Sequence, residues 1–164
     1  MATPRPTAAD NGVMVHVRLA TTADARDVAV LLDAFNAEFD TETPGAEALE
    51  PRLRGLLPTS SMFAVVAGEP PVGLALVSLR PNAWYDGPVA LLDELYVVPE
   101  LRSRGIGTEL LAQARAEARR RGAELMEINV DSPDTDARRF YERQGFSCVE
   151  PDTGEVALYY WGTT

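Results

Sequence analysis

The stretch that decides the fold covers residues 91–121 and reads LLDELYVVPELRSRGIGTELLAQARAEARRR. Residues 89–98 are almost continuously apolar and are interrupted only by Asp93 and Glu94, as expected for a central strand covered on both faces. Pro99 ends this strand, and apolar residues at helical spacing then predict a helix from about residue 105 to residue 121. The sequence therefore predicts a strand, a glycine-containing loop and a helix in direct succession.

The loop of this element, residues 102–107 with the sequence RSRGIG, is suited to binding an anion. Such a turn points unpaired backbone N–H groups and the positive end of a helix dipole toward one place. Gly105 and Gly107 let the backbone approach a ligand closely, and Arg102 and Arg104 add positive charge. Leu110 replaces the third glycine of a dinucleotide-binding motif, and the Gly-Lys-Ser/Thr of a nucleoside triphosphate loop is missing. We expect a phosphate group here; the alternative is a glycine turn with solvated arginines.

The rest of the chain, read outward from this element, predicts one α/β domain with a mixed, mostly antiparallel sheet of about seven strands and about four helices. Apolar residues between positions 28 and 39 recur at helical spacing and should pack on the sheet. Residues 1–12 are expected to be a disordered tail, and residues 13–164 the domain. The expected strands cover residues 13–19, 62–67, 72–79, 89–98, 124–130, 146–150 and 156–161, and the expected helices cover residues 21–39, 47–57, 105–121 and 133–144.

Composition excludes several classes of function. The 164 residues carry a formal net charge of -10, which opposes nucleic-acid binding and weakly favours a cationic or neutral substrate. No apolar run approaches the roughly 20 residues that span a bilayer, and residues 1–11 lack the apolar core of a signal peptide. The single cysteine, Cys148, excludes an internal disulfide and a clustered thiolate metal site, and is expected to be a small buried side chain. A reducing cytoplasm is the simplest location, with no membrane partner.

A second motif lies further along the chain, where residues 137–146 read ARRFYERQGF. Together with the RSRGIG loop, this motif resembles the GNAT N-acetyltransferase superfamily over roughly residues 14–161, most strongly over residues 91–146. The resemblance implies a sheet splayed between its fourth and fifth strands, acetyl-CoA as cosubstrate and no metal. It also implies transfer of the acetyl group to a primary amine by direct attack in a ternary complex, and that the chain can form a homodimer.

The resemblance further implies which residues bind the cofactor. Backbone N–H groups of the loop would hold the coenzyme A pyrophosphate, and the end of the preceding strand would pair with pantetheine. Many relatives carry asparagine at the position of Asp134, so the aspartate makes a cofactor contact doubtful there and can cap the next helix instead. The implied cofactor-binding residues are Leu95, Tyr96, Val97, Arg102, Ser103, Arg104, Gly105, Ile106, Gly107, Thr108 and Asp134.

Two residues are candidates for catalysis. The resemblance makes Tyr141 the proton donor to the departing thiolate; the alternative is that it only packs on its helix. An amine must lose a proton before it attacks, and Glu94 is the first candidate to accept that proton. In a regular strand Asp93 would point the opposite way, so that only one carboxylate faces the cleft. Asn129 stands where some relatives have a glutamate base, and an amide cannot act as one.

Other interpretations remain open at this point. Glu94 can instead anchor a substrate ammonium group or serve as a structural carboxylate. The whole chain can be a non-catalytic module that binds acyl-CoA. The first two helices, the terminal hairpin and the loop of Trp84 and Tyr85 should shape the acceptor pocket, although the two aromatic side chains can instead simply pack. The sequence does not distinguish a small-molecule amine from a peptide amine as the acceptor.

Overall fold

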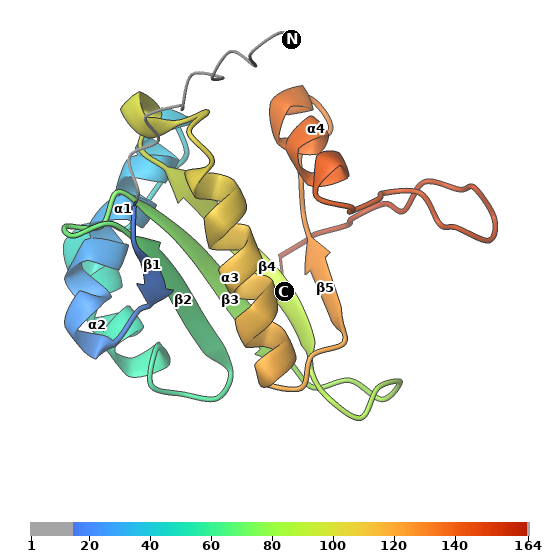
Figure 1. The fold of residues 1–164 in the computed structure, drawn as a ribbon, viewed down its shortest axis with the longest axis horizontal. Helices are drawn as coiled ribbons and strands as arrows, with labels where there is room; N and C mark the ends of the chain where they lie inside the picture. Colours follow the sequence, from blue (N-terminus) through green and yellow to red (C-terminus); the bar gives the residue numbers. More distant parts are fainter. Residues whose placement is uncertain (1–14, 164) are drawn as a thin grey trace, which may run out of the picture.

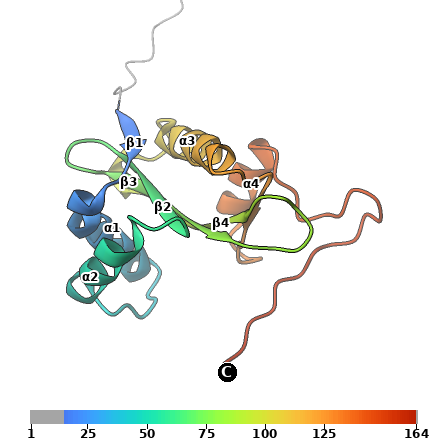
Figure 2. The same ribbon diagram turned by 90° about the horizontal axis from the view of Figure 1, so that it is seen from below.

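The computed structural model describes residues 15–163, which form a five-stranded sheet between layers of helices (Figures 1 and 2). The strands follow one another across the sheet in chain order. Four of them are antiparallel neighbours, and the fifth runs parallel to the fourth, so the sheet is mixed as predicted. The strands are β1 (Val17–Leu19), β2 (Met62–Ala67), β3 (Gly73–Arg80), β4 (Val89–Val97) and β5 (Leu125–Ile128). The predicted tail, residues 1–12, lies outside the described residues.

Four α-helices cover the sheet, as predicted. Helices α1 (Ala25–Glu38) and α2 (Ala46–Leu56) lie on one face, and α3 (Ile106–Arg120) lies on the other. Helix α4 (Thr135–Arg143) follows β5 and stands beside α3 (Figure 2). Short 3-10 turns precede α1 and α3, at η1 (Thr22–Asp24) and η2 (Pro99–Leu101). Within residues 15–163, no helix has both the length and the apolar character needed to cross a bilayer.

The central strands are apolar on both faces because each face is covered by helices. On one face, Val65 and Val77 pack with Leu110 and Leu111 of α3. On the other face, residues of β2 and β3 pack against α1 and α2 in a second core cluster. Full burial of one such side chain contributes about 1.5–3 kcal/mol to stability. The two clusters hold the sheet rigid, which fixes the positions of side chains at its end.

The turn η1, which leads into helix α1, starts at a capping box, and α1 ends near the site. Thr21 accepts a hydrogen bond from the Ala23 backbone N–H, and the Asp24 carboxylate accepts one from the Thr21 N–H. Most of the predicted apolar face is buried, but its last member, Phe39, is 55% exposed because the helix ends one residue earlier. Phe35 is partly buried, with its ring centroid 5.2 Å from that of Phe39.

The terminal hairpin expected over residues 146–161 does not form two further strands. Only the pair Val149 and Val156 bridges, next to a turn closed by the Glu150 N–H and the Glu155 carbonyl. The following segment leaves the domain (Figure 2), and Trp161 is 83% exposed. Because no described strand pairs with it, the sheet has five strands instead of about seven. Cys148, expected to be buried, is exposed.

Candidate active site

The site lies where β4 and β5 separate. The two strands pair only from Val89 with Leu125 to Leu92 with Ile128. Residues 93–97 of β4 continue beyond this point, and β3 pairs with this part of the strand along one edge only. A cavity of about 1380 Å³ occupies the gap and is lined by β4, by residues 128–131, by the loop before α3, by α4 and by the end of α1. The predicted splay between the fourth and fifth strands is therefore confirmed.

A β-bulge places two carboxylates beside this cavity. Leu76 pairs with Glu94, whereas the adjacent Val77 pairs with Leu92, so Asp93 is an extra residue on β4. The alternation expected for a regular strand does not hold at this position, and both Asp93 and Glu94 line the cavity. The hydroxyl of Ser78 donates a hydrogen bond to the Asp93 carboxylate over 3.2 Å. Asp93 thus has a partner on the neighbouring strand.

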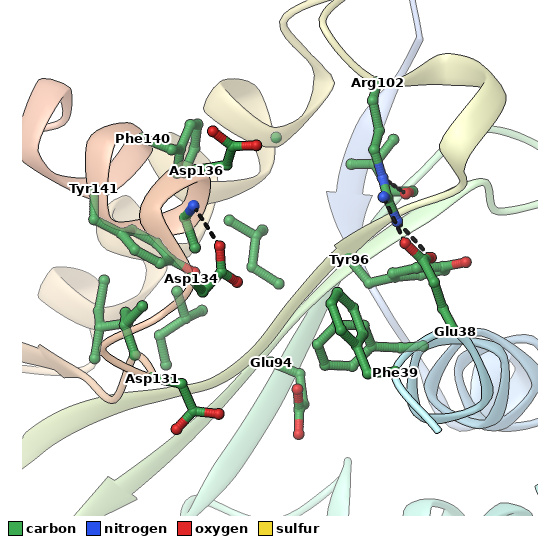
Figure 3. A pocket seen from close by; sticks show the side chains of 18 of the residues that line it. Glu38, Phe39, Glu94, Tyr96, Arg102, Asp131, Asp134, Asp136, Phe140 and Tyr141 are labelled. Atoms are coloured by element: carbon green, nitrogen blue, oxygen red, sulfur yellow. Dashed lines mark hydrogen bonds and ion pairs between the residues drawn. The ribbon is translucent and has the colours of Figure 1, made fainter. Parts of the chain in front are cut away.

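Glu94 is partly buried between the two walls of the cavity (Figure 3). Removal from water, together with the negative charge of Asp93, raises the pKa of its carboxyl group to about 7. A carboxyl group with this pKa exchanges a proton readily near neutral pH. Glu94 is therefore chemically suited to accept a proton from a substrate.

Tyr141 projects into the cavity from α4 (Figure 3). Burial raises the pKa of its phenol to about 12, helped by the negative charges of Glu94 and Asp134. The phenol therefore stays protonated at neutral pH and is able to donate that proton. The ring packs edge-on against Phe140 and Phe146, with centroids 5.2 and 6.0 Å apart. Both readings of Tyr141, as a packed ring and as a proton donor, are compatible with this position.

The glycine loop, residues 102–107, forms another part of the cavity wall. Ser103 and Gly105 have positive φ angles of 60° and 84°, and Gly105 is the N-cap of α3. The backbone N–H groups at this helix start have no partner within the helix. Ile106, Gly107 and Thr108 of the first turn line the cavity. This geometry fits the phosphate group expected from the sequence.

Arg102 makes a contact that the sequence did not predict. Its guanidinium donates two hydrogen bonds of 2.7 Å to the carboxylate of Glu38, at the end of α1, and a third of 2.8 Å to the Val97 carbonyl (Figure 3). These hydrogen bonds, together with the positive charge of Arg102, lower the pKa of Glu38. Arg102 lines the cavity, but part of its charge is neutralised. Arg104 does not line it and instead donates to the Glu100 carbonyl.

Asp134 caps α4, as the sequence suggested. Its carboxylate accepts a hydrogen bond of 2.9 Å from the Ala137 backbone N–H, and its side chain also borders the cavity. Every other predicted site residue except Arg104 lines the same cavity. Within residues 15–163, no group of three or more histidine, cysteine, aspartate or glutamate side chains is placed to hold a metal ion.

The cavity wall agrees only in part with the expectation that the first two helices, the terminal hairpin and the loop of Trp84 and Tyr85 shape the acceptor pocket. The end of α1 and one residue of the terminal segment, Tyr159, line the cavity. No residue of α2 lines it. Trp84, considered as a wall residue, is 89% exposed and does not line the cavity. Its loop precedes β4, whereas the cavity lies at the other end of that strand (Figure 1).

Comparison with known proteins identifies the class of protein. Residues 28–146 match the model of the acetyltransferase (GNAT) family. The aminoalkylphosphonate N-acetyltransferase of Salmonella typhimurium is 33% identical over 136 residues, which cover 80% of this chain and 84% of that protein. The crystal structure of a protein from Arthrobacter sp. FB24, assigned as an acetyltransferase, is 50% identical with a TM-score of 0.86, over 95% of this chain and all of that one.

A more distant structure agrees in fold. An aminoglycoside acetyltransferase from an uncultured soil metagenomic sample, solved with trehalose, has a TM-score of 0.74 at 21% identity, over 92% of this chain and 96% of that one. The chain belongs to the GNAT family of acetyltransferases. The family, the fold class and the enzyme class predicted from the two motifs are confirmed, and the reaction is acetyl transfer to an amine, for which the family uses acetyl-CoA.

Proposed function

We propose that this enzyme transfers the acetyl group of acetyl-CoA to a primary amine by direct attack within a ternary complex. The observation that carries the proposal is the placement of three features in one cavity: the open edge of β4, the N-terminus of α3, and the side chains of Glu94 and Tyr141. A single cavity that holds both substrates lets the amine reach the thioester without an acyl-enzyme intermediate. Proximity of this kind supplies a large part of the rate of a two-substrate reaction.

The donor half of the site fits coenzyme A. The free N–H groups from Ser103 to Thr108 would hold the pyrophosphate at the positive end of α3. The open edge of residues 95–97 would pair with the pantetheine arm, since β5 has turned away by then. Arg102 would contribute mainly by fixing the loop, because Glu38 already neutralises part of its charge. At the margin of the donor site, Arg104 would contribute positive charge and Asp134 would cap α4.

The acceptor half would carry out the proton transfers. Glu94 would take a proton from the ammonium group, directly or through water, which frees the nitrogen lone pair. The nitrogen would then bond to the carbonyl carbon of the thioester while the carbon–sulfur bond breaks. Tyr141 would donate its proton to the leaving thiolate, and the second proton that the nitrogen loses as the amide forms would return to Tyr141 through water. The pKa of about 7 for Glu94 and of about 12 for Tyr141 match these opposite roles.

The acceptor is proposed to be a small-molecule or peptide amine without a nearby anionic group. Asp93, Glu94 and Asp131 border the cavity, so an anionic acceptor would be repelled. The Salmonella relative is named for an aminoalkylphosphonate acceptor. We therefore expect this enzyme to prefer amines and diamines over aminoalkylphosphonates, a difference that a panel of acceptors at equal concentration measures directly.

The deciding experiment is a thiol-release assay with acetyl-CoA and that panel, together with thermal unfolding. Acetyl-CoA at 100 times its Kd should stabilise the fold by about 2.7 kcal/mol and raise Tm by several degrees. Stabilisation with thiol release from at least one amine supports the proposal. Stabilisation without any thiol release would favour the alternative of a non-catalytic acyl-CoA-binding module.

Self-association is part of the proposal. Extended, uncharged and apolar residues 156–161 are exposed, and the outer edge of β5 pairs with no strand in the described part of the chain. Such surfaces favour pairing between chains. We expect a homodimer in which this segment of one copy pairs with β5 of the other. We also expect residues 13–164 to form the folded domain and the protein to be located in the cytoplasm. Light scattering should give twice the mass of the 17.8 kDa chain, and Tyr160→Ser with Trp161→Ser should halve it.

A further inference from the structure

Helix α4 carries Tyr141 but is weakly attached to the rest of the domain. None of its residues is fully buried, although it is strongly amphipathic. Just past its midpoint, Phe140 packs on the first turn of α3, where a Cβ on Gly107 would lie 3.8 Å from the ring. The position of the tyrosine hydroxyl on the next residue therefore depends also on what holds the C-terminal end of this helix.

The C-terminal end of α4 closes with a Schellman motif. The Phe146 N–H donates to the Tyr141 carbonyl and the Gly145 N–H donates to the Glu142 carbonyl, both over 3.0 Å. Gly145 adopts the required left-handed conformation, with a φ of 85°. The motif brings Phe146 back onto the ring of Tyr141. The cap and the tyrosine therefore form one packed unit.

Arg115 of α3 holds this unit. Its guanidinium donates a hydrogen bond of 2.9 Å to the carbonyl of Gln144, the C-cap of α4, which no longer has a partner within the helix. The same guanidinium lies 5.1 Å from the ring centroid of Phe146. A cation at a helix C-terminus also complements the helix dipole. One partly buried side chain thus contacts both the cap carbonyl and the ring that packs against Tyr141.

We propose that Arg115 is a positioning residue that fixes α4 against α3 and thereby places the hydroxyl of Tyr141 at the site of acetyl transfer. This inference rests on the proposed role of Tyr141. Arg115 does not line the cavity, so it acts only through the cap and Phe146. Loss of its guanidinium would leave both substrate-binding regions intact but allow the tyrosine to move.

The kinetic test uses Arg115→Met, which removes the charge and the donors but retains an unbranched apolar chain. We expect kcat to fall about 10- to 100-fold, consistent with loss of proton-transfer geometry, while both KM values change less than about twofold. Arg119→Met, which removes the same charge from an exposed position one turn further along α3, should retain kcat. Arg115→Lys retains a cation that can still donate a hydrogen bond to the Gln144 carbonyl, and should recover part of the loss.

A double-mutant cycle separates positioning from a general loss of structure. In the Tyr141→Phe background, Arg115→Met should change kcat less than about twofold, because the hydroxyl that it positions is already absent. An equal loss of kcat in both backgrounds would overturn the proposal, since Arg115 would then act by another route. Unchanged kcat for Arg115→Met in the wild-type background would overturn it as well.

Hydrogen exchange of the 164-residue chain without substrates tests the attachment independently of activity. We expect the amides of α4 to exchange faster in Arg115→Met than in the wild type, and those of the α3 interior and β4 to be unchanged. Unaltered exchange in α4 would refute the attachment. If Tyr141→Phe retains full turnover while α4 exchange increases in Arg115→Met, the proposed role of Tyr141 fails and the attachment stands.

Discussion

Two residues carry the proposed chemistry, Glu94 as the proton acceptor and Tyr141 as the proton donor. Tyr141 is the first to test. Its burial beside Glu94 and Asp134 raises the pKa of the phenol to about 12, so the proton is available at neutral pH. Tyr141→Phe keeps the ring that packs on Phe146 and removes only the hydroxyl. We expect kcat to fall by about 10²- to 10⁴-fold, the usual contribution of a general acid. Steady-state kinetics should show an unchanged KM for acetyl-CoA; unchanged kcat would remove Tyr141 from the mechanism.

Glu94 makes the rate depend on pH. Because its pKa is raised to about 7, the carboxylate that accepts a proton becomes populated only as the pH rises through that value. We expect kcat/KM of the wild type to increase from pH 5.5 to 8 with an apparent pKa of about 7. Glu94→Gln should lose this inflection, with activity recovering partly at high pH, where the free amine itself is populated. A uniform loss at every pH would instead indicate that Glu94 only binds the ammonium group.

At the scale of elements, a close approach of two turns fixes where β4 and β5 begin to pair. A Cβ on Gly87, before β4, would overlap the backbone carbonyl of Gly122, which follows α3. Since that neighbour is backbone, it cannot move aside as a side chain would. Gly87→Ala should therefore lower the free energy of unfolding by about 1–3 kcal/mol.

The matched control for this prediction is Gly55→Ala on the exposed side of α2, where a Cβ meets nothing within 4 Å. Alanine is preferred over glycine inside a helix, so this variant should be stabilised by about 0.5–1 kcal/mol. Urea denaturation of both variants measures the difference. Equal stability of Gly87→Ala and the wild type would show that the two turns can separate without cost.

The elements also show what the sequence could predict. Strand β4 and helix α3 match their predicted ranges within one residue, because hydrophobic pattern, proline and glycine are local signals. The bulge at Asp93 could not be predicted, since it depends on the register with β3. The ion pair of Glu38 and Arg102 could not be predicted either, because the two residues lie 64 positions apart in the chain. The prediction of two terminal strands was wrong for a similar reason. A strand needs a neighbouring strand to pair with, and no local sequence pattern shows whether one is present.

At the scale of the whole molecule, two carboxylates with large pKa shifts in opposite directions contribute to how stability depends on pH. Asp24 accepts hydrogen bonds of 2.7 and 2.9 Å from Arg18, which lower its pKa from 3.8 to about 2. A lowered pKa contributes stability above the unfolded value of about 3.8, and that contribution is lost as the pH falls through 2. The difference between the two pKa values of Asp24 corresponds to about 2 kcal/mol in the free energy of unfolding.

Glu94 acts in the opposite sense. Its pKa rises from 4.5 to about 7 on folding, so between these values the folded state binds more protons than the unfolded state. The free energy of unfolding must then decrease as the pH rises from about 4.5 to 7, by roughly 1–3 kcal/mol for a partly exposed group. Together with Asp24, this shift predicts maximal stability near pH 4 to 5, below the neutral range in which the proposed base is active.

Urea denaturation of three proteins from pH 2 to 8 tests this profile. The wild type should gain stability from pH 2 to 4 and lose it from pH 5 to 8. Glu94→Gln should flatten only the loss, and should be more stable than the wild type at pH 8, because the buried charge is gone. Asp24→Asn should reduce only the gain, to which the lowered pKa values of Glu38, Glu50 and Glu117 also contribute. If Glu94→Gln keeps the decline between pH 5 and 8, the raised pKa belongs to another group, and the proton acceptor in the cavity has to be sought among its neighbours, beginning with Asp93.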